Sequence, residues 1–165
     1  MIDLLIAELN TEAISTRKLI SSIPSDNLSW SPHPKSMSIG ALGKHIAESQ
    51  GAVCDILAVD VFDANEINTS FEEGPSTEEM LQIFDEGIEK ANAYLRTVTE
   101  EQLAKSWKLT KADQVIYEVP RAAAIKSFLL SHTYHHRGQL SVYLRLLDIP
   151  VPSVYGATAD DNPFK

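Results

Sequence analysis

Apolar side chains recur at steps of three and four residues in several stretches of the chain, which is the spacing of one helix face. The first stretch predicts a helix over Ile2–Ser22, ended by Pro24 and the polar residues around it. The second predicts a helix that starts near Ser36 or Ser38 and runs to about Ala58. The last predicts a helix over Pro120–Leu147, where a proline in the first turn costs no hydrogen bond.

A third helix has the clearest start. Ser76 is followed three residues later by Glu79, the spacing of a capping box, and apolar residues then recur at helical steps as far as Leu95. Before it, residues Asp60–Pro75 form a polar connection that is long for a link between helices. A crossover or a functional loop would explain its length.

Two shorter segments break the helical pattern. Glu100–Leu103 predicts one helical turn, and the apolar residues on either side of Lys111–Asp113 alternate, which favours a short hairpin. Leu28–Lys35 is irregular, and its Trp30 is expected to fold back over the core rather than face water. The sequence thus predicts one domain over residues 1–165, of the all-α class. Its predicted architecture is a four-helix bundle with a long crossover after the second helix and a short hairpin before the fourth.

Composition limits the binding partners and the cellular compartment that we expect for this chain. The net charge is −9 and lysine and arginine do not cluster, so we expect no binding to nucleic acid. No apolar run reaches the roughly 20 residues that span a bilayer, so we expect no membrane segment. The single cysteine, Cys54, excludes an internal disulfide and suits a reducing compartment, so we expect a cytoplasmic protein. Its apolar neighbours favour a core residue over a nucleophile.

Three of the five histidines lie within the last predicted helix. His132 and His136 fall near the centre of its apolar stripe, one turn apart, where two imidazoles can reach one metal ion. His135 falls at the edge of the stripe. His45, beside the buried face of the second helix, is the natural third ligand. The pattern leaves two interpretations open: a metal site, or core histidines paired by hydrogen bonds.

Three histidine ligands would leave coordination positions for water or substrate. Neutral imidazoles do not compensate the charge of a dication, so the ion could acidify bound water or hold a thiolate. Thr133 stands where metalloproteases of the His-Glu-x-x-His type carry their glutamate base, which argues against that mechanism.

Several stretches resemble the DinB/YfiT-like family of helical metalloproteins. They are His132-x-x-His135-His136-Arg137-Gly138-Gln139-Leu140, Tyr143-Leu144-Arg145, Ile149-Pro150, Tyr155-Gly156, Ser29-Trp30-Ser31-Pro32 and Met37-Ser38-Ile39-Gly40-x-Leu42-x-x-His45-Ile46. The resemblance implies a four-helix bundle with a crossover, a homodimer, and nickel or zinc held by His45, His132 and His136. Ser131 and Thr133 depart from the asparagine and glutamate that many members carry.

Other polar residues are pocket candidates with ordinary alternatives. Gln139 lies on the ligand stripe and is the strongest of them. Glu48, one turn after His45, could orient that histidine or act as a base, although a solvent-facing glutamate needs no explanation. Arg137 could bind a substrate carboxylate or simply pair with an acid on a helix face. His135 could line the pocket or make a structural hydrogen bond, and His33 is expected at the surface.

Two functions follow from these residues. The first is a metal-dependent enzyme, a hydrolase or thiol transferase, that activates water or a low-molecular-weight thiol against a small electrophile. The alternative is a non-catalytic bundle, stabilised by metal, that acts as a stress-related dimeric binding protein. The substrate, the reaction and the catalytic residues are not assigned by the sequence.

Overall fold

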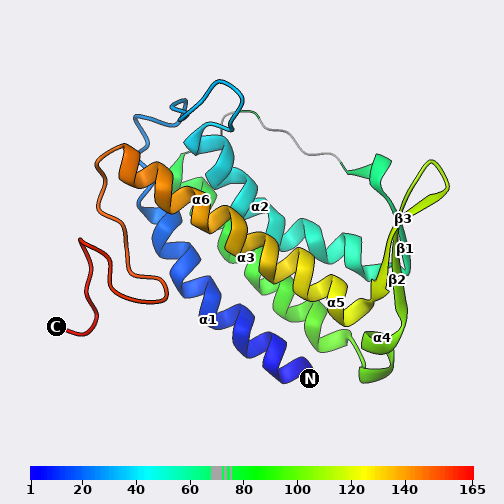
Figure 1. Cartoon of the computed structure of the whole chain (residues 1–165). Coiled ribbons are helices and arrows are strands. Elements are labelled where there is room, and N and C mark those ends of the chain that lie inside the picture. Colours follow the sequence, from blue (N-terminus) through cyan, green and yellow to red (C-terminus); the bar gives the residue numbers. More distant parts are fainter. Residues whose placement is uncertain (68–71, 73, 75) are drawn as a thin grey trace.

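The described residues of the computed structural model are 1–67, 72, 74 and 76–165, and most of them are helical. The long helices are α1 (Ile2–Ser21), α2 (Ile39–Ala58) and α3 (Thr77–Thr97), followed by the short α4 (Glu100–Ala104). The last helical rod comprises α5 (Arg121–Ile125), the π-helical segment η2 (Lys126–Ser131) and α6 (His132–Leu146). Figure 1 shows α6 lying along α2 on one side and α1 on the other, with α3 behind.

A small sheet closes one end of the molecule (Figure 1). Strands β2 (Ser106–Lys111) and β3 (Gln114–Pro120) form the predicted hairpin. Its two turn residues, Ala112 and Asp113, both have positive φ, as a type I′ turn requires. Strand β1 (Val61–Asp63) pairs in parallel with β2, a pairing that the sequence did not predict. The all-α prediction therefore holds for the helices and misses this third strand.

The predicted helix boundaries are close to those observed. Ser38 caps α2, and Ser76 and Glu79 form the predicted capping box of α3. The predicted connection Asp60–Pro75 begins with β1 and the 3-10 turn η1 (Ala64–Glu66). Most of its remainder, residues 68–71, 73 and 75, lies outside the described residues.

The predicted helix Pro120–Leu147 is not one continuous α-helix. Pro120 is its N-cap rather than its first residue, and the π-helical η2 separates α5 from α6. A π-helical turn joins residues five apart instead of four, so it changes the angle between the side chains before and after it. The residues of α6 therefore face directions that a single α-helical phase from Arg121 would not give.

The buried residues form two apolar clusters. One lies at the sheet end of the molecule, where the indole of Trp107 is fully buried between α2 and the last rod. The other lies at the opposite end, and Trp30 packs against it with its ring 5.7 Å from that of Tyr143. Trp30 thus covers the core, as predicted.

Candidate metal centre

The histidine site is formed by one side chain of α2 and two of α6. His45 lies on the side of α2 that packs against α6, between the buried residues Leu42 and Ile46. His132 and His136 lie one turn apart at the start of α6. All three are half-buried, so their rings are held by the helices while the site keeps access to solvent.

The three imidazoles converge on one point. Nε2 of His132 lies 3.0 Å from Nε2 of His136 and 3.3 Å from Nε2 of His45. One ligand nitrogen from each ring lies within 4.8 Å of the other two. The ring planes are almost perpendicular to one another, at 84–87°. The edges of the rings, and not their faces, therefore point at the shared centre.

The two Nε2–Nε2 separations of His132, 3.0 Å and 3.3 Å, fit a single metal ion. Two nitrogens that each lie about 2.1 Å from one ion are about 3.0 Å apart at a right angle and about 3.4 Å apart at the tetrahedral angle. A hydrogen-bonded cluster fits less well, because a neutral imidazole has one N–H and the three facing nitrogens cannot all be paired by it. The residues present therefore suit a divalent ion held by three histidines.

Gln139 fixes the tautomer of one ligand. Nδ1 of His136 lies 2.8 Å from Oε1 of Gln139, and an amide oxygen can only accept. The proton of His136 therefore sits on Nδ1, and its Nε2 presents a lone pair to the centre. Metal-binding histidines in proteins are oriented by a hydrogen bond of this kind.

The electrostatic environment keeps the ligands neutral. Burial, together with the neighbouring imidazoles, lowers the pKa of His132 to about 4. Burial likewise lowers the pKa of His45 and of His136. Imidazoles must be deprotonated to bind metal, so the site is ready to accept a cation at neutral pH.

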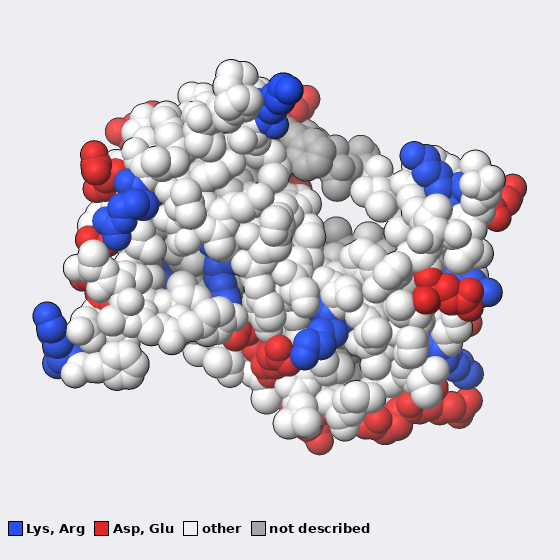
Figure 2. All heavy atoms as spheres, viewed as in Figure 1, with Lys and Arg blue, Asp and Glu red and all other residues white. Residues whose placement is uncertain are grey.

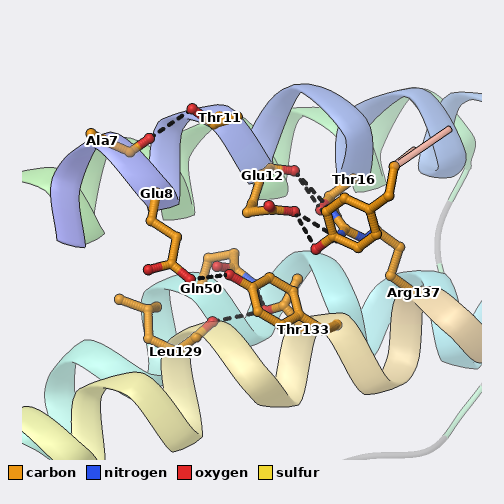
Figure 3. A network of polar contacts seen from close by, with 11 residues as sticks. Ala7, Glu8, Thr11, Glu12, Thr16, Gln50, Leu129, Thr133 and Arg137 are labelled. Atoms are coloured by element: carbon orange, nitrogen blue, oxygen red, sulfur yellow. Dashed lines mark hydrogen bonds and ion pairs between the residues drawn. The ribbon is translucent and has the colours of Figure 1, made fainter. Parts of the chain in front are cut away.

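Another face of α6 carries a different polar network, shown in Figure 3. Arg137, only 3% exposed, pairs with Glu12 of α1 at 2.6 Å and donates to the hydroxyl of Tyr155 in the C-terminal segment. That hydroxyl in turn donates to Glu12 at 2.9 Å. Arg137 therefore pairs with an acid of a neighbouring helix, one of its two predicted roles, and points away from the histidines.

Thr133 lies on that same closed side. Its hydroxyl accepts a hydrogen bond of 2.8 Å from Nε2 of Gln50 on α2 and donates to the carbonyl of Leu129 (Figure 3). Both side chains are buried. The residue that replaces a glutamate of related motifs thus joins α6 to α2, the two helices that carry the histidines.

The structure separates the predicted site residues into two groups. His45, His132, His136 and Gln139 come together, whereas Arg137 does not join them. Glu48 is exposed on α2, one turn after His45, and His135 is exposed on α6 with its ring 4.8 Å from that of His136. His33 is exposed, as predicted, in the loop before α2.

Sequence reasoning did not single out Tyr143 as a site residue. It lies four residues after Gln139, and both side chains line a groove beside α6. This i, i+4 spacing on the histidine stripe was the signal that could have found it.

Comparisons with known proteins identify the family of the chain. A sequence model of the DinB family matches residues 1–162, and the chain belongs to this family. The uncharacterised protein YjoA of Bacillus subtilis is 31% identical over 131 residues, which cover 79% of this chain and 80% of that protein. The uncharacterised protein YrdA of the same organism is 23% identical over 150 residues, which cover 91% of this chain and 85% of that protein.

Two solved structures share the fold. A DinB-like protein from Bacillus cereus superposes with a TM-score of 0.72 at 19% identity, covering 92% of this chain and 95% of that one. The crystal structure of YjoA superposes with a TM-score of 0.67 at 26% identity, over 88% and 92% of the two chains. Within the described part of the chain, no helix is both long and apolar enough to cross a membrane.

Proposed function

We propose that this protein is a metal-dependent enzyme in which His45, His132 and His136 hold nickel or zinc. Its reaction activates water or a low-molecular-weight thiol against a small electrophile, as a hydrolase or a thiol transferase does. The single observation that carries the proposal is the convergence of three imidazoles, in which Nε2 of His132 lies 3.0 Å from that of His136 and 3.3 Å from that of His45, spacings suited to one ion. A bound ion would supply a Lewis acid that acidifies water or a thiol.

The chain itself supplies ligand orientation and access. Gln139 holds the His136 ring in the tautomer that faces the centre. Three protein ligands leave coordination positions free, which is typical of catalytic rather than structural zinc sites. Thr133 is buried and bonded to Gln50, so it offers no base. Glu48, exposed one turn beyond His45, is the carboxylate best placed by sequence to move a proton near the site.

A second function has its own supporting observation. The ligands come from two helices, α2 and α6, so an ion would also link these helices and stabilise the bundle. In this alternative the protein is a non-catalytic, metal-stabilised binding protein. For either function we propose a cytoplasmic homodimer built on a four-helix bundle, a proposal supported by the family resemblance.

Metal analysis tests the site directly. Protein purified without chelators should contain about one nickel or zinc per chain, and His132→Ala should contain less than about a tenth of that. His135→Ala is the matched control, because it removes an exposed imidazole from the same helix and should leave the metal content unchanged. Equal metal loss in both variants, or metal-free wild-type protein that gains none on incubation with nickel or zinc, would refute the site.

Activity and stability then separate the two functions. A screen of thiol-acceptor electrophiles and of small esters and amides should give turnover in wild-type protein that is absent in His132→Ala. If the screen stays blank while chelation lowers the melting temperature by about 10 °C or more, the metal is structural and the second function holds.

A further inference from the structure

A groove runs beside the histidine site, between the loop that precedes α2 and the outer side of α6. It has a volume of about 580 Å³. The loop contributes residues 34–38, and α6 contributes Gln139 and Tyr143. Its size suits a small organic molecule, since ligand pockets usually measure about 300–1,000 Å³.

Gln139 connects this groove to the histidines. Its Oε1 accepts from Nδ1 of His136, while the same side chain lines the groove. Among the described residues its amide nitrogen has no protein partner. One end of the carboxamide therefore orients a candidate metal ligand, and the other end has two N–H donors to offer to a molecule in the groove.

Tyr143 provides a second donor. Its side chain is nine-tenths buried, with 9% exposed, and its ring packs against that of Trp30. In the described part of the chain, the hydroxyl of Tyr143 has no hydrogen-bond partner. Every side-chain nitrogen or oxygen that is fully buried in that part does have a partner, so the hydroxyl is not fully buried. The hydroxyl must therefore reach solvent, and the groove is the solvent-filled space that Tyr143 borders.

The charge of the groove is unusual for this protein. The whole chain has 23 acidic and 14 basic residues, but the described residues that line the groove include Lys35 and no carboxylate. No acidic side chain among the described residues pairs with the Lys35 ammonium. Ser38, the N-cap of α2, also lines the groove, so the positive end of a 20-residue helix dipole faces it. In Figure 2, the surface over α6 likewise carries few acidic groups.

We propose that this groove binds the substrate of the enzyme, and that the substrate is a small carboxylate with an apolar body. Lys35, the Tyr143 hydroxyl and the Gln139 amide recognise the carboxylate, while Met37 and the Tyr143 ring contact the apolar part. The inference rests on the proposed metal-dependent function, because it places the substrate within reach of the histidines. Binding to the groove and binding of the metal are nevertheless separate properties that can be measured separately.

Titration of two small molecules tests the groove. Phenylacetate and its neutral isostere phenylacetamide are added to ¹⁵N-labelled protein, in metal-loaded and in metal-free form, and the amide shifts are followed by NMR. We expect phenylacetate to shift the amides of residues 35–38, 139 and 143 in both forms. It should bind about tenfold or more tightly than phenylacetamide, because only the carboxylate makes charge-assisted hydrogen bonds.

Two variants and two controls sharpen the test. Lys35→Gln and Tyr143→Phe should each weaken phenylacetate binding about fivefold or more, while metal content stays at the wild-type level. Lys111→Gln and Tyr117→Phe make the same chemical changes on the hairpin, away from the groove, and should leave the affinity unchanged.

Each remaining result decides between the proposals. Equal binding of the amide and the carboxylate, absence of binding, or insensitivity to Lys35→Gln and Tyr143→Phe would overturn the groove proposal. If phenylacetate binds only the metal-loaded form and ignores both variants, it coordinates the metal, which overturns the groove and leaves the metal site standing. Groove binding in a protein that takes up no metal would overturn the proposed function instead.

Discussion

Two faces of α6 are formed by residues that are adjacent in the sequence, and they differ in how far their polar side chains bind other groups of the protein. His132 and His136 face α2, and their Nε2 atoms converge with that of His45. Thr133 and Arg137, each the next residue along the chain, face the interior and make every hydrogen bond with protein partners. The first side is open to a ligand, and the second is closed.

This difference shows how the helix that carries a binding site can be held in position by contacts outside the site, without a contribution from the bound ligand. The closed side fixes the rotation and position of α6 against α1 and α2, through Arg137–Glu12 and Thr133–Gln50. The open side then needs no stabilising contacts among the histidines. Adjacent residues should therefore have separable effects on metal binding and on stability.

The largest effect is expected for His136→Ala. Removal of one of three ligands, and of the partner of Gln139, should reduce metal content from about one ion per chain to almost none. The free energy of unfolding of the metal-free protein should change by only about 1 kcal/mol or less, because the variant loses a half-buried side chain and its hydrogen bond to the half-buried Gln139. Elemental analysis and urea denaturation measure the two quantities.

Arg137→Met should give the reverse result. Glu12, 15% exposed, would be left without its charged partner, and the loss of one member of a buried pair costs about 3 kcal/mol. Urea denaturation of the metal-free variant measures this loss. The folded variant should still bind metal, and a variant that keeps its stability but loses metal would show that the closed side belongs to the site.

A smaller effect on metal affinity is expected for Gln139→Leu. Without the acceptor at Oε1, the His136 ring loses its orientation and its preferred tautomer, and such changes typically weaken metal binding about 10–100-fold. Competition with a chelator measures the affinity. Gln139→Glu retains an acceptor and serves as the control; an equal loss in both variants would contradict the orienting role.

The smallest effect is expected for Thr133→Val, which keeps the shape of the side chain. The buried amide of Gln50 would lose its acceptor, at a cost of about 1–2 kcal/mol in the free energy of unfolding. Thr133→Ser restores the hydroxyl and should recover most of that loss. Metal content should not change in either variant, which elemental analysis checks.

Much of the site could be predicted because it depends on local periodicity. Helical phase alone separates His132 and His136 from His135. The capping box of α3 is likewise predicted by a local pattern, the four residues from Ser76 to Glu79. The partners of Arg137 could not be predicted, because Glu12 lies 125 residues away on another helix. A charged residue within an apolar stripe indicates that a partner is needed, and does not indicate which one.

Two features of the fold were also beyond the sequence pattern. The parallel pairing of β1 with β2 joins segments separated by more than 40 residues, and a three-residue strand leaves no alternation to read. The sequence of the π-helical segment η2 has no pattern of apolar residues that would distinguish it from an α-helix. Its Phe128 packs at the sheet end against the rings of Trp107 and Tyr117, residues more than ten positions earlier in the chain.

The π-helical segment has a consequence for how this chain tolerates insertions and deletions. A π-helical turn holds more residues than an α-helical turn, so loss of one residue from 126–130 can be absorbed by conversion of η2 to an α-helical turn, with little rotation of α6 relative to α5. Loss of one residue within the α-helical α2, between Ser38 and His45, has no such reserve and would rotate His45 by about 100° relative to the N-terminal end of that helix. The chain should therefore tolerate a one-residue deletion in η2 better than one between Ser38 and His45.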